Sequence, residues 1–271
     1  MNRSAGTAFS LGRVWAMLLR YLYILKSSWP RTLELLYWPT LQVMIWGFMS
    51  QFFSQNSSYV ARAFGVLLGA VMLWDVMFRS QLGLSISFLE EMWSRNLGHL
   101  FATPLRAYEW VISLLAMSVI RVMIGIVPAA LLAIPLYHYS IFAMGLPLLA
   151  FLAVLMAMGW ALGLAICGLI LRHGMGAESL AWTVIFALSP VSCVYYPASI
   201  LPHWLQPVAW SLPQTYVFEG MRILLFEHVF RTDYFFAAAG LDIVFMALGI
   251  AIFFVFFRNA RHRGALMQMG E

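Results

Sequence analysis

Charge is scarce in this sequence. Only 10% of its 271 residues are Asp, Glu, Lys or Arg, whereas 63% are hydrophobic, and the mean hydropathy is +0.84. A soluble globule of this length needs more polar surface than this composition supplies. The sequence therefore excludes that class and indicates that most of the chain faces lipid.

Residues for ATP binding and common hydrolytic chemistry are also missing. Lys26 is the single lysine, and no P-loop Gly-Lys-Ser/Thr is present, so any ATP-driven activity needs a separate subunit. The six histidines form no His-Glu-x-x-His pair, and there is no Gly-x-Ser-x-Gly. Cys167 and Cys193 lie in apolar stretches, which favours packing over a disulfide or a metal site. We predict a chain that is not itself an enzyme and has no cofactor or metal.

Long apolar runs are what the sequence does contain. A membrane-spanning helix needs about 20 apolar residues. Six such stretches predict an all-α membrane protein with six transmembrane helices in one domain, 1–271. The stretches are 33–54, 63–88, 107–137, 143–171, 176–196 and 235–257.

The basic residues predict the orientation of these spans. With both termini inside, 11 of the 16 lysines and arginines fall in cytoplasmic segments. Only Arg62, Arg222 and Arg231 fall outside, and Arg79 and Arg121 fall within spans. This bias follows the positive-inside rule, so the N and C termini are predicted to be cytoplasmic. The net charge of +5 then reflects topology and anionic lipid, and nucleic acid is not an expected partner.

The segment before the first span, 1–31, predicts an amphipathic interfacial helix. Arg13 and Arg20 mark its polar face, opposite an apolar stripe. A helix that packs on a soluble partner without lipid contact is the alternative. The apolar stripe consists of Leu11, Trp15, Leu18, Leu22, Leu25 and Trp29.

A polar island interrupts the apolar sequence at 89–111, between the second and third spans. Its charged residues alternate at helical spacing with Trp93, Leu97 and Leu100, and Thr103 and Pro104 end the helical part. This pattern indicates a docking surface in water at the membrane face. A second unusual segment, 197–232, contains four prolines and many aromatic residues, which predicts short re-entrant helices on the external side.

Three charged residues are expected within the spans as an intramembrane polar element or gate. Asp75 and Arg79 are four residues apart on one helical face, where they can compensate each other as part of a path or as a purely structural pair. Arg121 has no partner at helical spacing, and Asp75 or Asp242 could supply one. Aromatic residues could line a substrate path, although packing against lipid is the alternative. These path candidates are Tyr37, Trp38, Trp46, Phe52, Tyr195 and Tyr196.

Two segments resemble the membrane subunits of type-2 ABC exporters. The first is EEMWSRNLGHLFATPLRAYEWV, with its acidic start, Gly-Leu turn and Thr-Pro-Leu before a glutamate. The second is YYPASILPHWLQPVAWSLPQTYVFEGMR at 195–222, with Tyr-Pro, Leu-Pro-x-Trp-Leu and a terminal Glu-x-x-Arg. Their order and spacing, with six spans and inward termini, extend the resemblance over nearly the whole chain.

The resemblance implies that 89–106 is a coupling helix that docks on a separate ABC ATPase subunit. It also implies two copies of that ATPase, which would carry ATP and Mg²⁺, and a second copy of this permease. His99 departs from the family pattern, in which an acidic residue is more usual at this position. The docking residues implied are Glu90, Glu91, Trp93, Arg95, Asn96, Leu97, His99 and Leu100.

The function expected from this resemblance is the permease subunit of an ATP-driven exporter in the bacterial inner membrane. Its cargo would be an amphipathic, lipid-linked, polysaccharide or drug-like substrate, moved from the cytoplasm or inner leaflet. Two alternatives stay open, an ion-coupled secondary transporter and a non-transporting membrane assembly factor. Buried carboxylates are sparse for a proton-coupled carrier.

Overall fold

The protein folds as a bundle of helices. The computed structural model describes residues 9–56 and 58–263, and every regular element in these residues is helical, so the predicted all-α class is confirmed. In chain order the elements are α1 (Leu11–Ser27), α2 (Trp29–Asn56), α3 (Ser58–Trp93), α4 (Leu97–Ala102), α5 (Ala107–Tyr137), η2 (Ile141–Met144), α6 (Leu146–His173), η3 (Met175–Ala177), α7 (Leu180–Leu188), η4 (Ala198–Ile200), α8 (Gln206–Trp210), α9 (Pro213–Glu227) and α10 (Thr232–His262).

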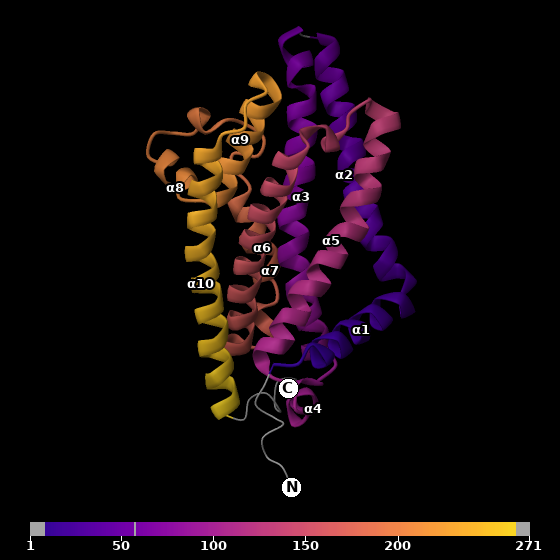
Figure 1. Ribbon diagram of the computed structural model, residues 1–271, viewed down its shortest axis with the longest axis vertical. Helices are drawn as coiled ribbons and strands as arrows, with labels where there is room; N and C mark the ends of the chain where they lie inside the picture. Colours follow the sequence, from indigo (N-terminus) through magenta and orange to yellow (C-terminus); the bar gives the residue numbers. More distant parts are fainter. Residues whose placement is uncertain (1–8, 57, 264–271) are drawn as a thin grey trace.

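The bundle is organised around α3. Helices α2, α5 and α6 pack directly against it, and α10 packs on α6 (Figure 1). Gly159 allows α6 to approach α3 closely, because a Cβ at this position would lie 2.7 Å from the carbonyl oxygen of Met77. Small residues of this kind let apolar helices pack backbone against backbone in a membrane.

Four helices in the described residues are long and apolar enough to cross a membrane. They lie at Gly65–Trp93, Ala107–Tyr137, Leu146–His173 and Thr232–His262, and they cover all or most of four of the six predicted spans. The other two predictions are not confirmed. Helix α2 has 28 residues but too polar a composition, and α7 has only nine. Helix α7 ends at Leu188, because Pro190 has no N–H and cannot make the helical bond to the carbonyl oxygen of Phe186.

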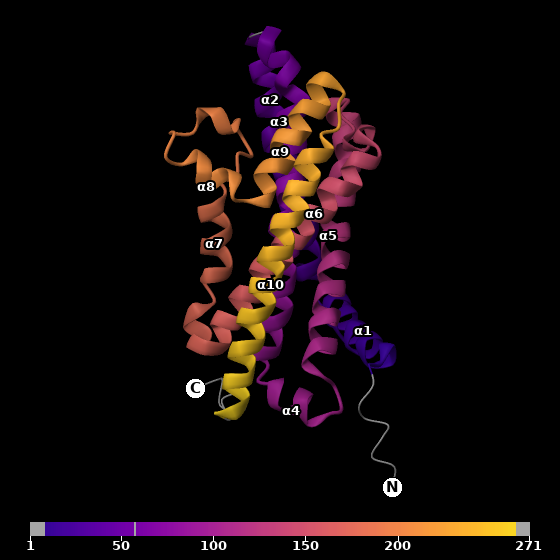
Figure 2. The same cartoon turned by 60° about the vertical axis from the view of Figure 1, so that its left-hand side comes forward.

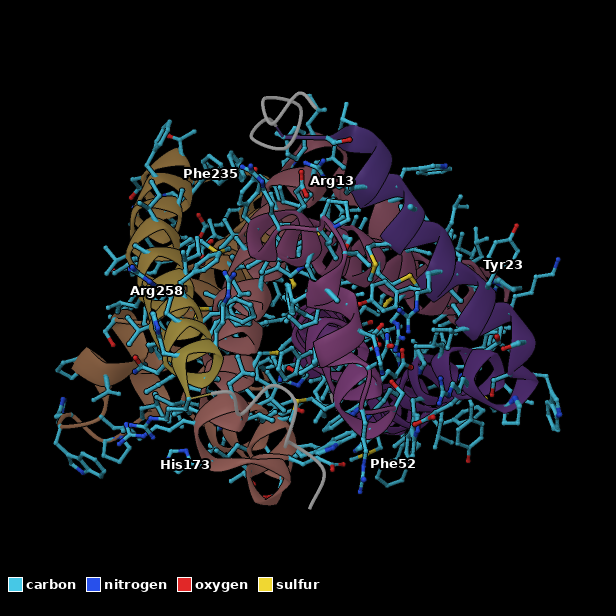
Figure 3. All side chains as sticks on the ribbon, turned by 90° about the horizontal axis from the view of Figure 1, so that it is seen from below. Arg13, Tyr23, Phe52, His173, Phe235 and Arg258 are labelled. Carbon is cyan, nitrogen blue, oxygen red and sulfur yellow. The ribbon has the colours of Figure 1, made fainter. Side chains whose placement is uncertain are left out.

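Helix α1 is shorter than the predicted interfacial segment 1–31, since it spans Leu11–Ser27, and it is rotated about its axis relative to the prediction. Residues 1–8 of the predicted interfacial segment lie outside the described residues. Leu11 and Trp15 of the predicted apolar stripe are 73% and 57% exposed. Tyr23 also points away from the bundle (Figure 3). The rotation arises because Arg13 and Arg20 turn inward to bind carboxylates. The residues that α1 buries are Val14, Met17, Leu18, Tyr21 and Leu25.

The segment 197–232 divides into short helices, as its prolines predict. Elements η4, α8 and α9 each begin within two residues after a proline or include one at the start. Helix α8 lies at one end of the bundle, and α9 packs back along α6 and α10 (Figure 2). Helices α1 and α4 lie at the other end of the bundle, the α4 end (Figure 1).

Candidate functional site

A tight turn at the α4 end reverses the chain between α3 and α5. Arg95 has a φ of 52°, and the backbone N–H of Asn96 donates to the Glu91 carbonyl oxygen at 3.0 Å. Leu97 and Leu100 are 2% and 5% exposed, so they anchor α4 on the core. The predicted docking residues therefore separate into two groups. Leu97 and Leu100 point inward, whereas Trp93, Arg95 and His99 are exposed and Asn96 is half-buried.

Glu90 and Glu91 are buried, contrary to the prediction of an exposed polar patch. The Glu91 carboxylate accepts hydrogen bonds from Arg20 Nη2 at 3.0 Å and from Asn96 Nδ2 at 2.8 Å. The Glu90 carboxylate pairs with Arg31 Nη1 at 3.0 Å. Both carboxylates thus bind arginines of this same chain. The sequence pattern missed these pairs because Arg20 and Arg31 are 71 and 59 positions away from their partners.

Glu109, in the first turn of α5, forms a third pair of the same kind. Its side chain is fully buried, and its carboxylate accepts from Arg13 Nε at 2.8 Å and from the backbone N–H of Ser10 at 2.9 Å. The backbone N–H of Arg106 donates to the same carboxylate at 3.1 Å. A buried carboxylate with several charge-assisted bonds is held firmly in position. The start of α1 is thereby fixed to the start of α5.

These contacts form what we call the N-terminal clamp, made of Arg13, Arg20 and Arg31 with Glu109, Glu91 and Glu90. The three arginines come from α1 and the start of α2, and the three glutamates flank α4 on both sides. Tyr21 adds a neutral contact, because its buried hydroxyl accepts from Trp110 Nε1 at 2.8 Å. Burial raises the pKa of Tyr21, so the hydroxyl stays protonated. The clamp joins α1 rigidly to the turn that carries α4.

A groove of about 500 Å³ runs along α3. Helix α2 forms one wall, α7 forms the other, and α3 forms the floor from Val71 to Trp93. This stretch of helix is about 33 Å long at 1.5 Å per residue. At the α4 end, Trp93 Nε1 donates to Glu178 at 3.3 Å. At the opposite end, the rings of Trp46 and Tyr195 stack with centroids 5.0 Å apart.

The predicted path aromatics are only partly at this groove. Trp38 and Tyr195 line it, and Trp46 reaches it through its stack with Tyr195. Tyr37 and Phe52 are 51% and 63% exposed and do not line it. Tyr196 instead donates its hydroxyl hydrogen to the Pro190 carbonyl oxygen. The lining residues that sequence reasoning missed include Glu34, Trp74, Phe78, Glu178, Trp182 and Phe186.

The predicted intramembrane charges all line the floor of the groove, where they form two separate ion pairs. Arg79 Nε donates to Asp75 Oδ2 at 2.6 Å, so the predicted pair is formed. Arg121 pairs with Glu90 at 3.1 Å, and the expectation of Asp75 or Asp242 as its partner was wrong. The Arg121 side chain extends from α5 past Gly83 of α3, where an added Cβ would lie 3.5 Å from Arg121 Cδ. It thereby reaches the Glu90 carboxylate, which is nearer the α4 end of α3.

The comparisons with known proteins agree with this architecture. The model of the ABC-2 type transporter family matches residues 13–226, which is most of the chain. A search of the curated proteins finds no match. The matched region includes the clamp, α4, the groove and nearly all of α9. The chain therefore belongs to the ABC-2 type transporter family and is a multi-pass membrane permease subunit of an ABC transporter.

Proposed function

We propose that this chain is the permease of an ATP-driven exporter whose cargo moves along the groove and whose ATPase partner docks on α4. One structural relationship supports both halves of the proposal. Helix α3 forms the floor of the groove and leads directly into the turn that presents α4. A displacement of α4 would therefore be transmitted to the groove along a single helix.

The N-terminal clamp supports transmission as a rigid body. Its pairs tie α1 and the start of α2 to the residues on both sides of α4. Closely packed helices shift as units, since their interfaces are not continuously deformable. Closure of two ATPase subunits on ATP and Mg²⁺ would then move α1, α3 and α5 together. The exposed side chains of Trp93, Arg95 and His99 would form the contact with the ATPase.

A second copy of the permease would complete the path. The walls of the groove carry Trp38, Trp182 and Phe186, which are 50%, 42% and 59% exposed in the single chain. An exposed aromatic surface of this size is suited to a partner helix or to a lipid tail. Two grooves facing each other would enclose a path for an amphipathic, lipid-linked, polysaccharide or drug-like cargo.

The proposed topology has six crossings with the α4 end in the cytoplasm of a bacterial inner membrane. Helix α2 runs beside α3, and α7 connects the end of α6 to the segment that carries α8 (Figure 2). These two segments would complete six crossings, shielded from lipid by the second copy. Helix α1 would lie in the interface, with Leu11 and Trp15 in the lipid and Lys26 near anionic head groups.

Charge reversal on the exposed face of α4 tests the docking site. The variant Arg95→Glu/His99→Glu should still insert, but it should lose co-purification with the ATPase and nucleotide-driven transport. His203→Glu is the matched control, because His203 is also exposed but lies in the segment before α8. Normal ATPase binding by the α4 variant would refute docking at α4. Transport that persists without nucleotide and collapses with the proton gradient would favour an ion-coupled carrier instead.

A further inference from the structure

The floor of the groove contains two buried arginines whose hydrogen-bonding capacity is not fully used. Arg79 and Arg121 are 7% and 5% exposed, and both line the groove. Arg79 Nη2 and Arg121 Nε have no hydrogen-bond partner among the described residues. A buried donor without a partner is costly, and such groups are rare in folded proteins. Two of them at one cavity indicate that a ligand supplies the missing acceptors.

The two arginines occupy equivalent positions on helices that pack side by side. Each is followed four residues later by a glycine, as Arg79 and Gly83 on α3 and Arg121 and Gly125 on α5. Each arginine lies against the glycine of the other helix. A Cβ at Gly125 would be 3.1 Å from Arg79 Nε, and one at Gly83 would be 3.5 Å from Arg121 Cδ. The absence of side chains at these glycines leaves space for both guanidinium groups.

The proline in α2 adds an acceptor beside Arg79. Pro39 has no N–H, so it cannot make the helical bond to the carbonyl oxygen of Leu35. That oxygen would lie 2.9 Å from a Cβ at Gly125, in the same confined space as Arg79. Gly125 is therefore a sensitive position, because even a methyl group there would displace Arg79 or the backbone of α2.

The buried charges of the floor balance, because Arg79 and Arg121 are matched by Asp75 and Glu90, and Arg31 is 44% exposed. Asp75 compensates Arg79, whereas the single carboxylate of Glu90 is shared by Arg121 and Arg31. Glu34 and Glu178 also line the groove but are more exposed, so water and ions screen them. Selection for an anion therefore comes from the unpartnered guanidinium N–H groups, which bond a charged acceptor more strongly than a neutral one.

We propose that the groove binds the anionic head group of an amphiphile, a phosphate or carboxylate, through the unpartnered guanidinium N–H of Arg79. The apolar part of the ligand lies along the aromatic walls formed by Trp38, Trp74 and Trp182. This proposal rests on the proposed function, and it specifies the chemical class of the cargo. Planar arginine forks match the oxygens of phosphate and carboxylate groups, which also explains why arginine is used here and not lysine.

A binding experiment on the chain alone tests the head-group preference. The probes are brominated dodecyl amphiphiles with a phosphate, a maltoside or a trimethylammonium head group, which quench nearby tryptophans. Quenching of tryptophan fluorescence is counted as specific only where an excess of unlabelled dodecyl phosphate reverses it. The phosphate probe should bind about tenfold more tightly than the maltoside probe, the difference expected from one or two charge-assisted hydrogen bonds. Preference for trimethylammonium would overturn the proposal and assign selection to Glu34 and Glu178.

Two variants connect the preference to the floor of the groove. Asp75→Asn/Arg79→Gln removes both members of an ion pair, so it leaves no unpaired buried charge, and it should abolish the tenfold preference. Gly125→Ala changes no charge but displaces Arg79, so it should weaken the phosphate probe alone. Gly240→Ala is the control, because a Cβ there meets no atom within 4 Å. Retention of the full preference by the double variant would overturn the proposal.

Inorganic phosphate identifies the source of the anion. If inorganic phosphate competes with the phosphate probe, the site also binds the free ion. If only alkyl phosphates compete, binding requires the alkyl tail as well. Either result supports the anion site, which would be refuted if neither competitor displaced the probe. The binding assay contains no ATPase, so it is independent of the transport assay. If the chain shows no head-group preference but the complex still transports with nucleotide, this inference alone is refuted. Preserved preference without transport refutes the proposed function alone.

Discussion

Arg20 of α1 and Glu91 of α3 form an ion pair with a separation of 3.0 Å across 71 positions of sequence. The arginine side chain is 36% exposed, whereas the glutamate is 1% exposed. The pair therefore connects a surface helix to a carboxylate in the interior. It is also the contact that most directly ties α1 to the turn before α4.

Neutralising this pair on one side should destabilise the protein. Arg20→Gln leaves the buried Glu91 carboxylate with Asn96 as its remaining side-chain partner. We expect a loss of about 1.5–3 kcal/mol, which is the range for a hydrogen bond to a charged group. Thermal unfolding in detergent measures it, with Lys26→Gln as the control, since Lys26 is exposed and forms no ion pair among the described residues. The reversed pair Arg20→Glu/Glu91→Arg should recover part of the loss, and no recovery would argue against direct coupling.

Replacing Glu90 and Glu91 with lysine should uncouple ATP hydrolysis from transport through the clamp. A lysine at 90 would face Arg31 and Arg121, so three positive charges would replace a compensated cluster. We expect the variant to keep binding the ATPase, because the exposed face of α4 is unchanged, but to lose transport. Co-purification and transport assays on the same preparation distinguish the two effects. Loss of ATPase binding by this variant would instead support a role of Glu90 and Glu91 in docking the ATPase.

The contact between α3 and α6 should be intolerant of any side chain at Gly159. An added Cβ would lie 2.7 Å from the Met77 carbonyl oxygen, and backbone cannot move aside as a flexible side chain can. Gly159→Ala should therefore lower stability by about 1–3 kcal/mol, as overpacking usually does. Gly240→Ala should have little effect or stabilise α10 slightly, because alanine favours helix. Equal melting temperatures for the two variants would contradict this packing.

Cysteine labelling tests the orientation of the bundle. The native Cys167 and Cys193 are buried, so a membrane-impermeant maleimide should not label the wild-type chain in intact membranes. His99 and His203 are exposed at the α4 end and in the segment before α8. His203→Cys should be labelled from outside cells, whereas His99→Cys should be labelled only after the membrane is opened. Labelling of both from the same side would refute the proposed topology.

The sequence predicted the helices well where composition alone decides. The apolar runs over α3, α5, α6 and α10 and the prolines before α9 each specify local structure directly. The fifth predicted span was longer than α7, because an apolar composition does not reveal where the chain leaves the helical conformation. Helix α2 shows the reverse problem, since it is long enough to cross a membrane but its composition is too polar to indicate a span.

The candidate site was less predictable because its partners are distant in sequence. Hydrophobic periodicity assigned Arg13 and Arg20 to the outer face of α1, but ion pairing with Glu109 and Glu91 turns them inward. The pair of Asp75 and Arg79 was predictable, since its members are four residues apart on one helix. Arg121 and Glu90 are 31 positions apart on different helices, and no local pattern records such a contact.

The stack of Trp46 on Tyr195 has a consequence for the energy that transport requires. It joins the two walls of the groove at the end remote from α4. An aromatic pair contributes only about 0.5–1.5 kcal/mol beyond the area it buries. Thermal motion alone should separate the rings often. Under the proposed function, lipid or a second copy would then have to prevent leakage at this end, and the ATPase stroke would mainly give passage a direction.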